Sequence, residues 1–203
     1  MKFKFTQLFP LLISLIFVYA MMAYTFHHDI IFWYLYPFTL LVGIAICQLY
    51  ANYFDELPTW HYLIFGIGYG TILYGLIKVG HKILPHLDPS FNEELAMFLN
   101  TFAPTTILHY ILLMFIVVIG EEMFWRGYVQ QKLKLYTKPV YAIFITSLLF
   151  SISLAISGFA AGALAAFFSG LMLGALYEWK KSLPLIIIAH ETFVILLFLV
   201  LPL

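Results

Sequence analysis

Two adjacent glutamates, Glu121 and Glu122, are the residues of this chain best suited to acid or base chemistry. They end an apolar run, and Arg126 follows four residues after Glu122. A carboxylate can accept a proton as a general base. An ionisable side chain near the centre of a bilayer costs on the order of 2.5–3.5 kcal/mol, so two of them in one apolar segment indicate a role that offsets this cost.

Arg126 is the expected partner of one of these acids. In an α-helix, Glu122 and Arg126 lie one turn apart on the same face, with the acid on the favoured N-terminal side. Glu121 points about 100° away from Glu122, so the same arginine does not easily satisfy both carboxylates. We therefore predict a Glu122–Arg126 ion pair in which Arg126 orients the site. In the alternative interpretation, the three charges form a solvated helix end at the membrane surface.

His190 is the histidine expected at the depth of the glutamates. It stands about seven residues into the last apolar stretch, or roughly 10 Å deep at 1.5 Å per residue, and Glu121 has a comparable depth in its own stretch. His109 precedes Glu122 by thirteen residues, roughly 20 Å along a helix, which excludes it from the same site. The predicted site therefore consists of Glu121, Glu122, His190 and the orienting Arg126.

Two kinds of chemistry suit this set. A catalytic zinc site usually has three protein ligands and one open position, and Glu121, Glu122 and His190 supply three ligands for zinc or another divalent metal. Alternatively, Glu122 activates a water molecule without a metal while His190 stabilises the developing negative charge. The residue types alone allow both.

The composition indicates that the positioning elements lie in a membrane. Hydrophobic residues make up 64% of the 203 residues and charged residues 10%, whereas soluble domains have about 45–50% and about 25%. Lipid is therefore the expected surrounding partner. The formal net charge is zero, which argues against a nucleic-acid partner. The single cysteine, Cys47, excludes an internal disulfide.

Seven apolar stretches approach the length of about 20 residues that a membrane helix needs. We predict an all-α polytopic membrane helix bundle in which residues 1–203 form a single transmembrane domain. The segment 92–102 is expected to form a short surface helix or an eighth membrane element. The predicted spans are 8–25, 31–51, 61–80, 105–125, 139–157, 160–178 and 183–202.

The distribution of basic residues predicts the orientation in the cell membrane. Eight basic side chains lie on the N-terminal side of the predicted bundle and two, Lys78 and Lys82, on the other side. Cytoplasmic loops carry the excess of lysine and arginine, so we expect a cytoplasmic N-terminus and an external C-terminus. The four tryptophans, Trp33, Trp60, Trp125 and Trp179, fall near the predicted span ends, as in aromatic belts. The eight basic residues are Lys2, Lys4, Arg126, Lys132, Lys134, Lys138, Lys180 and Lys181.

The motif Glu121-Glu122-x-x-x-Arg126, followed by glycine and a basic loop, resembles the first motif of the CPBP family of intramembrane proteases. That family includes the type II CAAX prenyl endopeptidases and bacterial abortive-infection proteins. The resemblance covers residues 110–199, within a predicted core of 105–202. It continues through a Ser-Leu-Leu-Phe segment at 147–150, a glycine-rich span ending at 173–178, Ser-Leu-Pro at 182–184 and Ala-His at 189–190.

The resemblance implies an intramembrane site that binds a metal ion, such as zinc, or activates water directly. By position, Glu121 and Glu122 match the acidic pair, Arg126 the arginine and His190 the second histidine of the family. Two positions depart from the pattern. Leu154 stands four residues after Phe150, where a histidine belongs, and Val194 stands four after His190, where asparagine or aspartate belongs.

Two functions follow from this pattern. The retained acids and His190 predict an endopeptidase that cuts a membrane-associated peptide or protein. The departures at Leu154 and Val194 predict instead a catalytically silent scaffold that keeps the fold and binds another membrane protein. A small-solute transporter has less support, because the buried charges cluster in one place instead of marking a path across the bilayer.

Overall fold

The regular structure of this chain is helical wherever the structure describes it. The computed structural model describes residues 2–202, and this range contains helices and one isolated bridge, between Asp55 and Ser182, but no strand. The all-α prediction is therefore confirmed.

Most of the predicted apolar stretches form single helices. They are joined by short turns, except for the extended linker 51–58. A short 3-10 turn, Asp29–Ile31, separates the first two helices, and a π-helical turn, Leu196–Val200, follows the last one. The bounds are α1 Lys2–His27, α2 Phe32–Tyr50, α3 Thr59–Leu87, α4 Phe91–Phe102, α8 Pro139–Ala155, α9 Ala160–Lys180 and α10 Leu183–Ile195.

The fourth predicted span is a continuous helix of mixed geometry, Ile107–Leu133, which we call the central helix. Two stretches of it have the wider π-helical form, and the second begins at Glu122. π-Helical turns are rare and often occur at functional sites. Along the chain its parts are α5 Ile107–Leu112, η2 Leu113–Val118, α6 Ile119–Glu121, η3 Glu122–Gln130 and α7 Gln131–Leu133.

The helices have the dimensions of membrane spans. Among the described residues, six helices are long and apolar enough to cross a bilayer, and α8 is a shorter apolar helix of 17 residues. Each of the seven predicted spans corresponds to one of these helices, although α3 extends to Leu87 and the central helix to Leu133. The separate α4 is amphipathic in composition, with Glu93 and Glu94 in its first turn. The chain is a multi-pass membrane protein.

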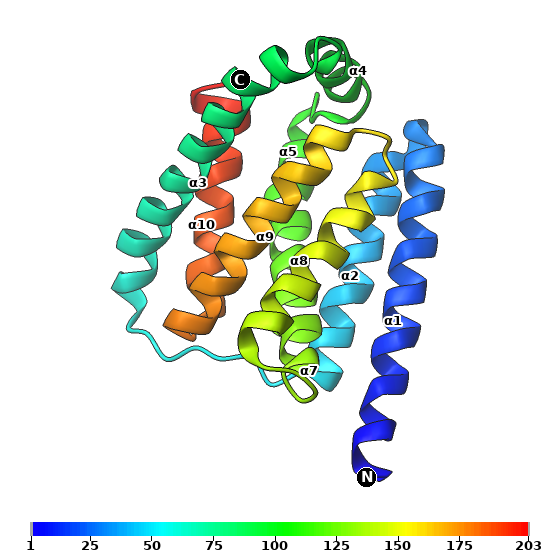
Figure 1. The fold of residues 1–203 in the computed structure, drawn as a ribbon, viewed down its shortest axis with the longest axis vertical. Coiled ribbons are helices and arrows are strands. Elements are labelled where there is room, and N and C mark those ends of the chain that lie inside the picture. Colours follow the sequence, from blue (N-terminus) through cyan, green and yellow to red (C-terminus); the bar gives the residue numbers. More distant parts are fainter. Residues whose placement is uncertain (1, 203) are drawn as a thin grey trace.

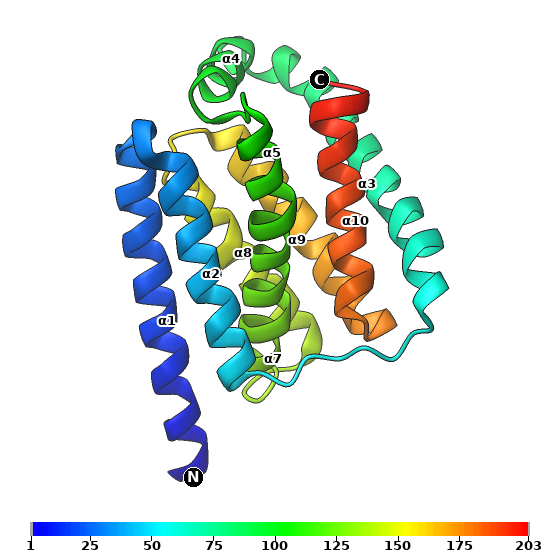
Figure 2. The same cartoon turned by 180° about the vertical axis from the view of Figure 1, so that it is seen from behind.

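The two ends of the chain lie at opposite ends of the bundle (Figure 1). The linker 51–58 and α7 lie at the end where α1 begins, and α4 lies across the other end, beside the C-terminus. Seen from behind, the central helix stands between α2 and α10, and α3 packs on the outer side of α10 (Figure 2). The pair α8 and α9 covers the opposite face of the central helix.

The C-terminal half of the central helix forms the core of the bundle. Every residue from Gly120 to Gln130 is buried. In the N-terminal half of the same helix, Ile107 and Phe115 are 78% and 66% exposed. This burial corrects the prediction for Trp125, which is enclosed by the bundle and is not part of an aromatic belt. Trp33 is also buried, while Trp60 and Trp179 are exposed as expected.

The linker 51–58 closes the end of the bundle where α1 begins. The amide of Leu183 donates to the carbonyl of Phe54 over 2.9 Å, and Ser182 Oγ donates to Asp55 Oδ1 over 3.0 Å. Glu178 binds Lys134, at 2.7 Å, and also Lys181. These contacts therefore attach the α2–α3 linker to the turn between α9 and α10, at the start of α10.

Glycines bring α3 close to α10. A Cβ atom at Gly70 would collide with the carbonyl oxygen of Ala189 and lie 2.6 Å from Thr192 Cβ. A Cβ at Gly66 would lie 2.6 Å from Ile188 Cγ2. Small residues allow membrane helices to pack closely. This contact supports the helix that carries His190.

We predict that Gly70→Val destabilises the protein by on the order of 1–3 kcal/mol, because the added side chain overpacks the α3–α10 contact. Thermal unfolding in detergent measures the change. Gly75→Val is the matched control, since a Cβ there meets no atom within 4 Å. An equal loss in both variants would mean that a β-branched residue in α3, and not the contact with α10, causes the effect.

Candidate active site

Four predicted site residues meet at the point where the central helix changes geometry. Glu121 is the last residue of α6, and Glu122 begins the π-helical stretch η3 that also carries Arg126. His190 comes from α10, which packs beside this stretch. Two separate segments of the chain therefore supply the acids and the imidazole, as predicted.

Glu122 is bound from two sides through one oxygen. Its Oε1 accepts a hydrogen bond from Arg126 Nη1 at 3.0 Å and lies 2.8 Å from His190 Nδ1. The Glu122 and Arg126 side chains are 0% and 1% exposed, so the predicted ion pair is confirmed and the solvated helix end is not observed. Because Oε1 is an acceptor, Nδ1 of His190 is the donor in this contact.

Arg126 is held by the fold as well as by its charge partner. Its guanidinium lies over the ring of Phe150 on α8, 4.8 Å from the ring centroid. The ring of Trp125 packs 5.7 Å from the same phenylalanine. A guanidinium over an aromatic face gains a cation–π attraction that is larger when water is excluded. Arg126 therefore links α8 to the acidic pair.

Glu121 has different partners from Glu122. The hydroxyl of Tyr36, on α2, donates to Glu121 Oε1. The other oxygen, Oε2, faces His190 Nε2 at 3.9 Å. This separation is longer than a direct hydrogen bond. The two acids consequently face opposite nitrogens of one imidazole ring, Glu122 at Nδ1 and Glu121 at Nε2.

The two sides of this cluster differ in access. The side chains of Glu121 and His190 are 8% and 10% exposed, whereas those of Glu122 and Arg126 are almost completely enclosed. All four residues are therefore buried, and the side chains of Glu121 and His190 are the less completely enclosed pair.

The arrangement does not fit a zinc ion bound by Glu121, Glu122 and His190 together. One ion cannot bind both nitrogens of the same ring, and the two carboxylates lie on opposite ring edges. Glu122 Oε1 is already the acceptor for Arg126. Among the described residues, no group of three or more His, Cys, Asp or Glu side chains is placed to hold a metal. Metal binding therefore stays a prediction. The arrangement of these three side chains does not support their binding one ion together.

The two departures from the family pattern lie on the helices that flank the site. Leu154 follows Phe150 by one turn of α8 and packs against the core, and Val194 is buried one turn after His190. The nearby hydroxyls do not replace the missing groups. Each donates to a helix carbonyl, namely Ser151 to Ala163 at 2.7 Å, Ser153 to Phe150 at 2.7 Å and Thr192 to Ile188 at 2.8 Å.

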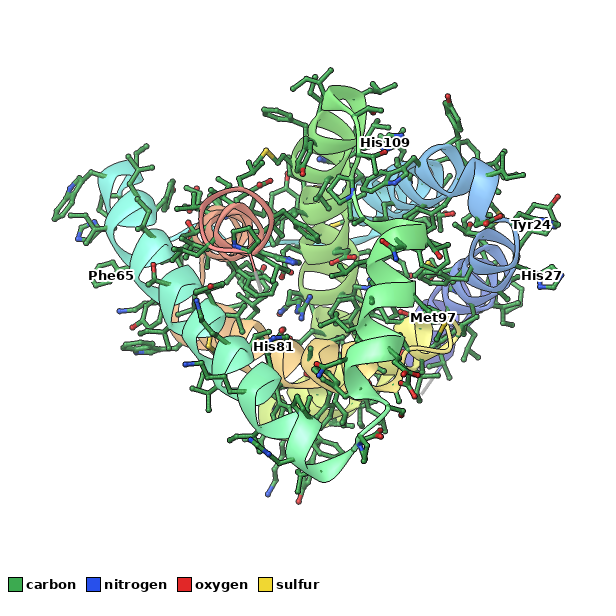
Figure 3. All side chains as sticks on the ribbon, turned by 90° about the horizontal axis from the view of Figure 1, so that it is seen from above. Tyr24, His27, Phe65, His81, Met97 and His109 are labelled. Carbon is green, nitrogen blue, oxygen red and sulfur yellow. The ribbon has the colours of Figure 1, made fainter. Side chains whose placement is uncertain are left out.

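His109 lies outside the site, as expected from its distance along the central helix. Its ring stacks on Trp33 of α2, with 4.8 Å between centroids. Figure 3 shows His109 near the N-terminal end of the central helix and His27 at the edge of the bundle.

Tyr36 is the site residue that sequence reasoning missed. It lies in an apolar span, far from the acids in sequence, and an aromatic residue in such a span is typical of ordinary packing. Only the approach of α2 to the central helix places its hydroxyl on Glu121.

Comparison with known families agrees with the motif. Residues 103–196 match the model of the family described as type II CAAX prenyl endopeptidase Rce1-like. The matched segment contains Glu121, Glu122, Arg126 and His190, but not α2. No curated protein and no solved structure matches the chain. The match over residues 103–196 therefore confirms the resemblance that the motif indicated.

Proposed function

We propose that this protein is an intramembrane endopeptidase that hydrolyses a membrane-associated peptide or protein. The observation that carries the proposal is the position of Glu121 Oε2 opposite His190 Nε2, 3.9 Å apart, on the less enclosed side of a buried ionic cluster. The family match gives independent support, because the family is described as endopeptidases. Lipid-anchored peptides are the substrate class that this description favours.

Glu121 is the general base in this mechanism. The gap of 3.9 Å would allow one water molecule to bind both Glu121 Oε2 and His190 Nε2 at about 2.8 Å. Glu121 takes a proton from this water while the water oxygen attacks the carbonyl carbon of the scissile bond. Glu121 then gives the proton to the leaving amine when the C–N bond breaks. Glu122 is less suited to this role, because its Oε1 already binds Arg126 and His190.

His190 stabilises the negative charge that develops on the substrate oxygen. Its Nδ1–H donates to Glu122, so Nε2 is the nitrogen left to face the substrate. When His190 is protonated, its charge and that of Arg126 balance the two carboxylates, and Nε2–H donates to the oxyanion. Glu122 holds the imidazole ring in place through Nδ1, and Glu122 and Arg126 together balance the charges of the cluster.

A second candidate function is a catalytically silent scaffold that binds another membrane protein. Leu154 and Val194 favour it, because neither side chain binds a metal or donates a hydrogen bond to an oxyanion. The buried Glu122–Arg126–His190 contacts would then be retained because they orient helices. Co-purification of a partner that is unaffected by Glu121→Gln, without peptide cleavage by the wild type, would favour this function.

We predict that Glu121→Gln and Glu122→Gln separate catalysis from stability. Glu121→Gln removes the base and lowers turnover of a lipid-anchored peptide by about 10²–10⁴-fold, with a smaller loss of thermal stability than Glu122→Gln. Glu122→Gln also lowers turnover, but it leaves Arg126 without its buried partner and costs about 3–5 kcal/mol of stability. The assay uses purified protein in liposomes and a peptide library that includes a farnesylated CAAX peptide.

Turnover that persists in Glu121→Gln would remove Glu121 from the role of base. Equal loss of stability in both variants would contradict the division between a base and an orienting acid. Glu93→Gln, in the first turn of the peripheral α4, is the matched control for loss of a carboxylate.

We also propose that the end of the bundle carrying the 51–58 linker faces the cytoplasm, which is the orientation that the basic residues favour. In a Cys47→Ser background, an impermeant maleimide should label Pro89→Cys in intact cells and Lys138→Cys only after permeabilisation. Both positions are exposed, one in the α3–α4 turn and one before α8. Labelling of Lys138→Cys in intact cells would reverse the orientation.

A further inference from the structure

The hydroxyl of Tyr36 reaches the acidic pair from a helix that the family match does not include. Tyr36 lies on α2, outside residues 103–196, and is 6% exposed. Its hydroxyl donates to Glu121 Oε1, the oxygen that does not face His190. Each oxygen of Glu121 therefore has its own neighbour, Tyr36 on one side and the His190 ring on the other.

The ring of Tyr36 is fixed by aromatic packing. It stacks on Phe32 with 5.3 Å between centroids, and the ring of Phe26 on α1 lies 6.3 Å away. Phe102 on α4 contacts both phenylalanines, at 5.3 Å and 4.8 Å. Rings from three helices thus restrict the Tyr36 side chain to one rotamer, in which its hydroxyl lies beside Glu121.

A glycine next to Glu121 permits the approach of α2. A Cβ atom at Gly120 would lie 2.7 Å from Leu40 Cβ, and Leu40 is one helical turn after Tyr36. One turn further, a Cβ at Gly43 would lie 3.3 Å from Phe124 Cβ. The helices can touch here only because both positions lack a side chain. The close contact sets the depth of Tyr36 relative to Glu121.

We propose that Tyr36 is a positioning residue of the site. By donating to Oε1 it fixes the rotation of the Glu121 carboxylate, so that Oε2 points at the gap before His190 Nε2. It supplies a polar contact to the acid from α2, whereas α8 offers only Leu154 at the position of the expected histidine. This role rests on the proposed endopeptidase function, although the Tyr36–Glu121 coupling itself does not.

The test is Tyr36→Phe, which removes one oxygen and leaves the ring in its aromatic contacts. With a peptide that the wild type cleaves, kcat should fall by about 10-fold to 100-fold, as expected for loss of a hydrogen bond to a charged group, while KM stays within about twofold. The matched control is Tyr19→Phe, because the Tyr19 hydroxyl also donates a hydrogen bond between helices, to the Leu149 carbonyl at 2.7 Å. Its kcat should stay at the wild-type value. Equal kcat in the wild type and Tyr36→Phe would overturn the inference.

A second measurement does not depend on activity. Melting temperatures of Tyr36→Phe, Glu121→Gln and the double variant form a cycle, and interacting residues give non-additive shifts. The double variant should lose less than the sum of the two single losses, whereas Tyr19→Phe and Glu121→Gln should add. Additive shifts for Tyr36 and Glu121 would overturn the inference even if the wild type cleaves peptides. Coupling without turnover in the wild type would support the contact and overturn the proposed function.

Discussion

A single carboxylate oxygen, Glu122 Oε1, joins the charges on which the site depends. It binds the Arg126 guanidinium at 3.0 Å and His190 Nδ1 at 2.8 Å, and the Glu122 and Arg126 side chains are buried. A charge inside a membrane bundle is tolerated when it is paired, and removal of one partner leaves the other uncompensated. The surrounding fold therefore has to present an acid, an arginine and a histidine at one depth.

The rest of the bundle serves this requirement. The central helix supplies Glu122 and Arg126 one turn apart, and α8 places the Phe150 ring over the guanidinium. The contact of glycines on α3 with α10, together with the link between the 51–58 linker and the start of α10, sets the position of His190. With one nitrogen of the imidazole bound to Glu122, the other is directed at Glu121. The chemical asymmetry of the two adjacent acids thus follows from the orientation of one ring.

Local spacing and depth made much of this arrangement predictable. The seven apolar stretches predicted the six membrane-length helices and the shorter α8. The four-residue spacing predicted the Glu122–Arg126 pair, and equal depth predicted the meeting with His190. Each of these depends on helix periodicity and bilayer thickness, which operate along the chain. The joint zinc ligation by both acids and His190 was predicted from residue types alone, and the ring geometry does not support it.

The remaining features depend on contacts between helices. Trp125 is buried because other helices surround the central helix. The residues next to Trp125 in the sequence do not indicate this burial. Tyr36 reaches Glu121 because Gly120 allows α2 to approach, a packing event with no local signature. The π-helical geometry from Glu122 onward likewise has no local pattern in the sequence.

The hydrogen bond between His190 Nδ1 and Glu122 can be measured directly by ¹⁵N NMR of the protein labelled at its seven histidines, with His190→Gln to assign the signal. The structure predicts a protonated Nδ1 whose proton is strongly deshielded, as in a bond to a carboxylate. This signal should be lost in Glu122→Gln and kept in Glu121→Gln. A His190 signal without a hydrogen-bonded Nδ1 proton, or one that changes equally in both variants, would contradict the division of roles between the two acids.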